Sequence, residues 1–259
     1  MCFDVVSATR SLIKYAQHRS DDPAQINALK EKLETLTKVL QPHFNISGFE
    51  HPALLAFTNE EPLEPHAIEW GLIPEDIKDS EQAIKIANMT LNARMETLFD
   101  KPSFKKAAEH RRCLIYLDAF YEHHHQKHQI IPYHISMKDE SPMIIAGIWQ
   151  EWRDPDSLQM RKTLSIVTTE GNERMKFIHN NPKNKGARMP AILHRAEQDI
   201  WLQPIENNDD RSRIKQLLLP FPEDALNYKT VRKLKGKGSV GDIPSAEDRY
   251  IYAEQLGLF

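Results

Sequence analysis

The sequence is poor in cysteine and glycine, with only 2 cysteines and 9 glycines in 259 residues. Two cysteines exclude a scaffold held together by disulfides, and so little glycine excludes a collagen-like chain. Aromatic residues make up 8%, but hydrophobic residues reach 40%, and a chain of this length can then bury a core without metals or cross-links. We expect both cysteines to be free thiols in the reducing cytoplasm.

Long apolar segments are also absent. The longest apolar run, residues 143–149 (MIIAGIW), is far shorter than the roughly 18 residues of a membrane-spanning helix. The first ten residues, MCFDVVSATR, contain an acid and lack the apolar stretch of a secretory signal. We therefore expect neither export nor contact with a membrane.

Neither sign of charge dominates the composition. Lys and Arg number 34 and Asp and Glu 37, so the net charge of −3 does not by itself attract a polyanion. Basic residues nevertheless gather in segment 174–195, which contains no acid, and in segment 229–237. Such segments are commonly solvated loops, and the alternative is a surface that binds phosphate groups.

Hydrophobic periodicity predicts helices on both sides of a block of strands. The clearest helix covers residues 22–40, where Asp22 is expected to cap the first turn and Pro23 to occupy it. Further helices are expected at the start of 79–99 and at 103–109, 195–202 and 210–218. Strands are expected at 113–122, 129–137, 142–149 and 163–169. This order favours one α+β domain with a central antiparallel or mixed, barrel-like β-sheet flanked by helices.

Cys2 has distinctive chemistry if the initiator Met1 is removed, and the small side chain of Cys2 permits this removal. Cys2 then carries an α-amine and a thiol on one residue. The amine condenses with an aldehyde to an imine, and the thiol closes a thiazolidine ring. An α-amine with a pKa of about 7.7 to 8 is partly neutral at physiological pH. A cysteine at this position is more often incidental, and Cys113 in its apolar strand is expected to be a core residue.

Short polar segments interrupt apolar surroundings at several places, and each alone is typical of a cap, a paired acid or a surface turn. They are 70–74 (WGLIP), 92–97 (NARMET), 118–122 (DAFYE), 178–179 (IH) and 188–193 (RMPAIL). With Met-Cys at the start, 146–149 (AGIW) and 168–172 (TTEGN), their order closely resembles the SOS response-associated peptidase (SRAP) family of abasic-site processing proteins. The match predicts a core over 2–202 and a C-terminal extension over 203–259 of a single domain.

The resemblance implies a covalent reaction with abasic sites in single-stranded DNA. Cys2 matches the residue that forms a thiazolidine with the ring-opened aldehyde, and Asn92 matches the residue that holds the adduct. Glu122 matches the general acid and base of ring opening, and His179 matches a group that assists proton transfer. The family is also inferred to remove its own Met1 at this site. No step requires a metal or another cofactor.

The resemblance also implies a DNA surface around these residues. Arg94 and Arg188 match arginines that contact phosphates, and Trp70 lies where an aromatic packs against DNA. In segment 174–195, Lys183 and Lys185 are expected to flank the groove. The expected partner is single-stranded DNA with abasic sites, bound by a monomeric cytoplasmic protein that associates with the nucleoid when it acts.

Some positions depart from the family pattern. Phe3-Asp4 replaces the common Gly-Arg, which removes a basic residue near Cys2. Ala119 replaces the usual Gly, and His123 replaces the Trp after the Glu. An insert-like loop, 181–187, separates the histidine from RMP. We expect these changes to alter DNA contacts rather than the chemistry.

Two other functions remain open from the residues alone. A cysteine peptidase or amidohydrolase would use Cys2 against other proteins and would need an oxyanion hole and a peptide cleft, whereas a nucleic-acid-binding module would leave Cys2 inert. The acid-free segment 174–195 favours DNA. The histidines of 123–128 are expected to form no metal site, because consecutive strand residues point to opposite faces and no zinc-ligand spacing completes the set.

Overall fold

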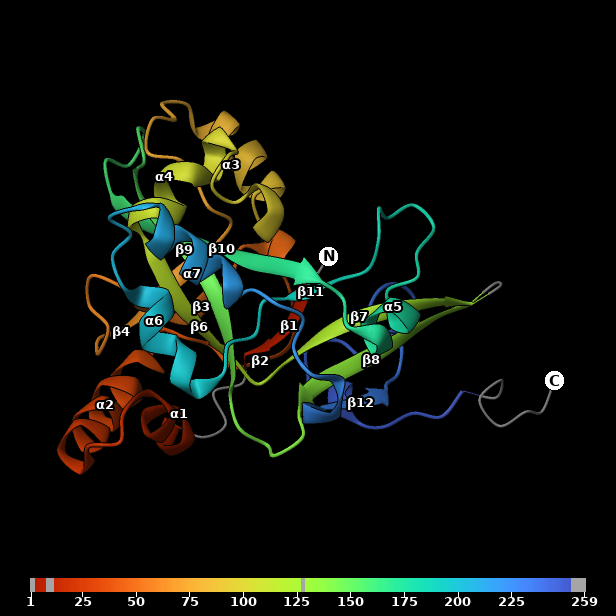
Figure 1. Cartoon of the computed structure of the whole chain (residues 1–259). Coiled ribbons are helices and arrows are strands. Elements are labelled where there is room, and N and C mark those ends of the chain that lie inside the picture. Colours follow the sequence, from red (N-terminus) through yellow and green to blue (C-terminus); the bar gives the residue numbers. More distant parts are fainter. Residues whose placement is uncertain (1–2, 8–11, 127–128, 253–259) are drawn as a thin grey trace.

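The structure, a computed structural model, describes residues 3–7, 12–126 and 129–252. Its strands form two neighbouring sheets, and helices cover the larger one (Figure 1). The strands are β1 (Asp4–Ser7), β2 (His43–Ser47), β3 (Ala53–Thr58), β4 (Pro65–Trp70), β5 (Asn92–Arg94), β6 (Arg112–Leu117), β7 (Ala119–Gln126), β8 (Gln129–Met137), β9 (Met143–Arg153), β10 (Met160–Glu170), β11 (Arg188–Pro190) and β12 (Leu226–Thr230). The helices are α1 (Leu12–Arg19), α2 (Pro23–Leu36), α3 (Ser80–Met89), α4 (Pro102–His110), α5 (Glu173–Ile178), α6 (Gln198–Leu202) and α7 (Asn208–Gln216), with short 3-10 turns that include η1 (Gly48–Glu50) and η2 (Met95–Thr97).

Five strands of the larger sheet close into a barrel. Around the ring, β10 pairs with β4, β4 with β3, β3 with β6, β6 with β9, and β9 with β10. Within the ring, the β4–β10 pairing is parallel and the other four are antiparallel. Beyond the ring, β5 and β11 lie on opposite edges of β10, since Arg94 and Pro190 both pair with Thr168. The predicted α+β fold with a mixed, barrel-like sheet is confirmed.

The barrel strands are buried on both faces, which explains their nearly continuous apolar sequences. The inner cluster includes Trp149, Leu164 and Ile166, each 0% exposed. The outer cluster joins the strands to the helices, where Leu29 of α2 and Trp201 of α6 are buried.

The smaller sheet has the strand order β12-β8-β7-β1-β2 and is antiparallel throughout. Its β7 continues directly from β6 of the barrel. The predicted strand over 113–122 is therefore two strands that separate at Asp118, whose backbone N–H donates to Val6 O at 3.0 Å. The chain passes from one sheet to the other at this residue.

The predicted helices exist, but their bounds differ: α4 is one residue longer at each end, α7 begins and ends two residues earlier, and others are shorter. Asp22 caps α2 by accepting from the Ala24 N–H at 3.0 Å, and the helix ends at Leu36 rather than at residue 40. The helix expected at the start of 79–99 ends at Met89, after which β5 takes a place beside β10. Within the described ranges, no helix has the length and apolar character needed to cross a bilayer.

Candidate active site

A cavity of about 630 Å³ lies where the smaller sheet meets the loop after α5 and the C-terminal segment. Phe3, the first described residue, lines it, and so does Glu122 of β7. Asn184 from the loop 181–187 and Lys235 from the C-terminal segment complete the wall on other sides. Segments that are remote in sequence therefore face one space.

Glu122 and His179 are in contact beside this cavity. His179 Nδ1 lies 3.1 Å from Glu122 Oε2, and the two residues are 3% and 7% exposed. The other carboxylate oxygen, Oε1, accepts from the His123 N–H at 3.0 Å. Burial raises the pKa of Glu122, but hydrogen bonds and charge interactions, among them those with His179 and His123, together outweigh it, so its pKa lies below the ordinary value. The side chain is a carboxylate at neutral pH and can accept a proton.

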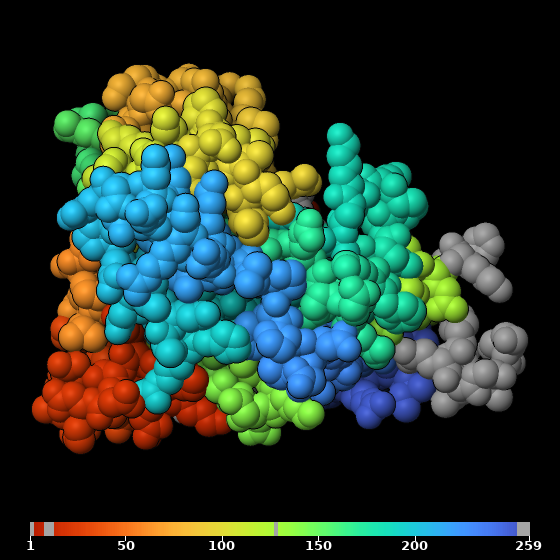
Figure 2. Space-filling model, in the orientation of Figure 1, coloured from red at the N-terminus to blue at the C-terminus, as the bar shows by residue number. Residues whose placement is uncertain are grey.

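The His179 ring is fixed by its own neighbours. It follows α5, and its backbone N–H donates to Met175 O at 2.7 Å. Nδ1 also lies 3.2 Å from Arg188 O, and Nε2 contacts the Asn184 side-chain amide. The loop 181–187 stands out from the surface (Figure 2), but Asn184 folds back onto the imidazole. Sequence reasoning missed Asn184 because it lies in an insert-like loop without a motif.

Asn92 lies in β5, opposite Ile166 of β10, and is 8% exposed. Asn92 therefore lies on one edge of β10, whereas β11, whose Arg188 contacts His179, lies on the other edge. The described contacts do not join Asn92 directly to Glu122 or His179. Its predicted role in holding an adduct stays a prediction.

Trp70 does not face DNA, and this prediction is wrong. The indole is 0% exposed, and Nε1 donates to Leu91 O at 2.8 Å. Its ring lies so close to Gly48 that a methyl group there would come within 3.0 Å of it. A large aromatic at the end of a barrel strand is needed for packing, and Trp70 supports the η1 turn from beneath.

The two arginines have different surroundings. Arg188 is 6% exposed, and its guanidinium binds both carboxylate oxygens of Glu96 and donates to Thr168 O at 2.7 Å. It is therefore not presented to phosphates as predicted, but links β11 to η2 across β10. Arg94, which precedes η2, is partly exposed. Its phosphate contact stays a prediction.

The lysines of the loop 181–187 and of the C-terminal segment lie on two sides of the cavity. Lys183 and Lys185 are exposed in the loop. Lys233 and Lys235 line the cavity itself, and Lys235 Nζ lies 2.6 Å from Asp4 Oδ1. The basic segment 229–237 was visible in the sequence, but nothing there indicated that it belongs to this wall.

Met1 and Cys2 lie outside the described residues. Phe3, to which Cys2 is bonded, is held in place because its carbonyl accepts from the Gly48 N–H at 2.7 Å. The other cysteine, Cys113, is a free thiol at 0% exposure, and burial raises its pKa. Cys113 is a core residue, as the sequence predicted.

The histidines of β7 alternate between environments. His123 and His125 line the cavity, whereas His124 stacks on Phe177 with ring centroids 4.5 Å apart. Burial lowers the pKa of His123, so this imidazole is neutral at physiological pH. Within the described part of the chain, no three His, Cys, Asp or Glu side chains are grouped to hold a metal ion. His128 lies outside the described residues.

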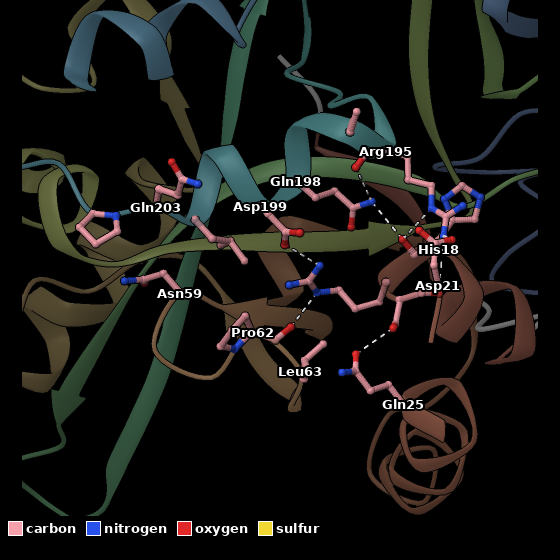
Figure 3. A pocket seen from close by; sticks show the side chains of 15 residues that line it. His18, Asp21, Gln25, Asn59, Pro62, Leu63, Arg195, Gln198, Asp199 and Gln203 are labelled. Carbon is pink, nitrogen blue, oxygen red and sulfur yellow. Dashed lines mark hydrogen bonds and ion pairs between the residues drawn. The ribbon is translucent and has the colours of Figure 1, made fainter. Parts of the chain in front are cut away.

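A second cavity of about 870 Å³ lies between the α1–α2 connection and α6 (Figure 3). Charged side chains that line it are bonded to other groups of the protein. Arg19 donates to Pro62 O at 2.6 Å and to Asp199 at 2.9 Å, and Arg195 pairs with Asp21. It contains none of the residues that the sequence predicted for the site.

Comparison with known proteins supports the motif-based resemblance. The chain is 36% identical over 168 residues to the abasic site processing protein YoqW of Bacillus subtilis, covering 64% of this chain and 69% of YoqW. It is 33% identical over 196 residues to YoaM of the same organism, which is also named an abasic site processing protein, covering 75% and 79%. A crystal structure of a protein from Bacteroides thetaiotaomicron superposes with a TM-score of 0.80 at 30% identity, covering 96% of this chain and all of that one. The family model for SOS response associated peptidase (SRAP) matches residues 10–237, and the chain belongs to this family.

Proposed function

We propose that this protein processes abasic sites by forming a covalent bond between Cys2 and the abasic sugar in single-stranded DNA. The contact between Glu122 and His179, beside a cavity that Phe3 lines, is the observation that carries the proposal. Glu122 and Phe3 line the same cavity, so a carboxylate in contact with an imidazole borders the space that is lined by the residue bonded to Cys2. The relatives named abasic site processing proteins support the choice of substrate.

Glu122 first opens the sugar ring. An abasic sugar is mostly a closed hemiacetal, and its aldehyde forms when the anomeric hydroxyl loses a proton and the ring oxygen gains one. The carboxylate of Glu122 accepts the first proton and returns it to the ring oxygen. Its low pKa keeps it ionised for this step.

The α-amine of Cys2 then attacks the aldehyde carbon, and a carbinolamine forms. Loss of water from it gives an imine: the nitrogen gives up its remaining proton, and the departing hydroxyl gains one, with Glu122 and His179, which are 3.1 Å apart, relaying the proton between the two atoms. The Cys2 thiol adds to the imine carbon, and its proton passes to the nitrogen. The resulting thiazolidine has two bonds to the former aldehyde carbon, so it is more stable to hydrolysis than the imine.

The amine exists only after the bond between Met1 and Cys2 is hydrolysed, and we propose that the protein cleaves this bond itself. The Glu122 carboxylate takes a proton from the attacking water, and this proton passes to the Cys2 amine as the amide bond breaks; if the Cys2 thiol attacks first, Met1 moves to the sulfur as a thioester, which water then hydrolyses. We also propose that 2–202 and 203–259 act as one domain, because Leu234 and Lys235 complete the cavity wall.

The proposal is tested with a single-stranded oligonucleotide that carries one abasic site. Wild-type protein is expected to give a band that survives heating in a denaturing gel, and intact mass is expected to show the loss of Met1 beforehand. Cys2→Ala is expected to give no stable band, while the matched control Cys113→Ala retains it. A heat-stable adduct with Cys2→Ala, or none with wild-type protein lacking Met1, would refute the proposal.

A further inference from the structure

An exposed aromatic residue lies next to the proposed site. Phe49 of η1 is 52% exposed, and its ring centroid is 5.1 Å from that of Phe3, which lines the cavity. The turn is held from beneath, because Gly48 packs on the ring of Trp70 and its N–H donates to Phe3 O. Phe49 is therefore a fixed aromatic surface at the edge of the cavity.

A cationic side chain is held beside the same turn. Lys235 Nζ lies 2.6 Å from Asp4 Oδ1 and 3.4 Å from the hydroxyl of Ser47, two residues before Phe49. Its side chain is 52% exposed, and an ammonium group has three donors. Lys235 can therefore keep its contact with Asp4 and still present a donor to the cavity.

The segment that carries Lys235 is fixed to β2. Asp242 accepts from the backbone N–H groups of Phe44 and Asn45 at 2.6 and 2.9 Å, and the Asn45 side chain donates to Leu234 O at 3.3 Å. Leu234 itself is 3% exposed and packs in the core of the smaller sheet. The position of Lys235 is thus set by the buried Leu234 before it and by the Asp242 hydrogen bonds after it.

An aromatic face beside an exposed cation is the combination that binds single-stranded nucleic acid, since a base stacks on the ring and a phosphate meets the cation. Phe177, the other exposed phenylalanine near the site, already stacks on His124 at 4.5 Å. The ring of Phe49 is tilted by 37° from that of its neighbour Phe3 and is not stacked on it. Phe49 is therefore better placed to accept a base.

We propose that Phe49 and Lys235 form a nucleotide subsite that binds the residue next to the abasic sugar, with its base on Phe49 and its phosphate on Lys235. The subsite rests on the proposed function, because it adjoins the cavity assigned to Cys2. It selects single-stranded DNA, since a base paired in a duplex cannot leave its stack to lie on Phe49 without losing its partner. It also places a basic group from the C-terminal segment beside Asp4.

The test uses fluorescence anisotropy with single-stranded oligonucleotides that carry a tetrahydrofuran abasic analogue, which has no aldehyde and cannot be cross-linked. Phe49→Ala is expected to weaken binding by at least about fivefold, the loss for one base–aromatic stack. Phe49→Trp is expected to retain affinity, and Leu158→Ala, at a residue that is 61% exposed on the β9–β10 connection, serves as the control.

A second set of oligonucleotides identifies the stacked base. The base on the 5′ or on the 3′ side of the analogue is also removed, which makes a double-mutant cycle with Phe49→Ala. One of the two removals is expected to abolish the effect of Phe49→Ala, because the stack is already gone. An effect that persists with both, or no effect of Phe49→Ala at all, would overturn the subsite.

The lysine is tested by the salt dependence of the same binding. The double variant Asp4→Asn/Lys235→Gln removes both charges, so that no buried carboxylate is left without its cation. The log–log salt slope is expected to fall by about 0.7, the value of one phosphate contact on a single strand. An unchanged slope would refute the role of Lys235. Because the analogue cannot react, these results are independent of whether Cys2 forms an adduct.

Discussion

The substitution Arg188→Ala distinguishes two possible roles of Arg188, a structural role beside the site and a role in binding DNA. The guanidinium makes charged hydrogen bonds to Glu96 and to Thr168 O, and hydrogen bonds to charged groups contribute about 1.5–3 kcal/mol each. The Glu96 side chain is 42% exposed, so water rehydrates the carboxylate once Arg188 is gone. We therefore expect a loss of about 2–4 kcal/mol in the free energy of unfolding, near the lower part of the range for breaking a buried pair.

Two measurements check this expectation. Urea denaturation is expected to show a lower midpoint with an unchanged m-value, because the same surface is exposed on unfolding. The salt slope for binding to abasic single-stranded DNA is expected to stay at the wild-type value. A slope lower by about 0.7 with unchanged stability would instead identify Arg188 as a phosphate contact.

Glu96→Gln is a second test, because the two possible roles of Arg188 predict different effects of this change on DNA binding. If Arg188 bound phosphates, neutralising its partner would free the guanidinium and strengthen DNA binding. If it joins β11 to η2, the same change lowers stability and leaves binding unchanged. Burial raises the pKa of Glu96, but the hydrogen bond and charge of Arg188, a backbone hydrogen bond and the charge of Arg94 together outweigh it, so the pKa lies below its ordinary value of 4.5. The stability from this pair is present above that pH and is lost as the pH falls through the lowered pKa, so the difference between wild type and Arg188→Ala shrinks in acid.

Trp70→Phe removes the bond to Leu91 O and is expected to lower stability by about 1–3 kcal/mol without changing DNA affinity, as measured by denaturation and anisotropy. Gly48→Ala brings a methyl group within 3.0 Å of the Trp70 ring and is expected to weaken single-stranded DNA binding because η1 must shift; unchanged binding would show that the turn can yield. Cys113 is expected to resist iodoacetamide until the protein is denatured, and rapid labelling of the native protein by peptide mapping would contradict its burial. Glu122→Gln is expected to slow adduct formation by about 10²–10⁴-fold in a gel time course, and a rate near wild type would exclude it as the acid and base.

Much of the middle of the chain was predictable because its patterns are local. The β-branched runs at 129–137 and 163–169 are strands, and the capped periodic segment from Asp22 is a helix. The motifs also identified Glu122 and His179, which the fold brings into contact.

The remaining features depend on contacts between distant segments. The barrel closes through a parallel pairing in which Glu69 and Trp70 meet Thr163 and Leu164, and no local pattern indicates so short a ladder. Residue type also could not predict whether Trp70 and Arg188 face the interior or DNA, because a tryptophan can pack in a core and an arginine can pair with an acid inside the protein. Both are buried and make structural contacts at positions where the family resemblance implied DNA contacts.

The proposed chemistry depends on how the two sheets are held against each other. Glu122 belongs to the smaller sheet, whereas His179 is fixed by Arg188 of β11, which pairs with β10 of the barrel sheet. The 3.1 Å contact between the two side chains therefore spans the junction between the sheets. The connection between β6 and β7, which consists of the single residue Asp118, is one of several places where the chain crosses this junction. A substitution that shifts this junction can thus alter proton transfer without touching DNA, because a displacement of about 1 Å is enough to take reacting groups out of position.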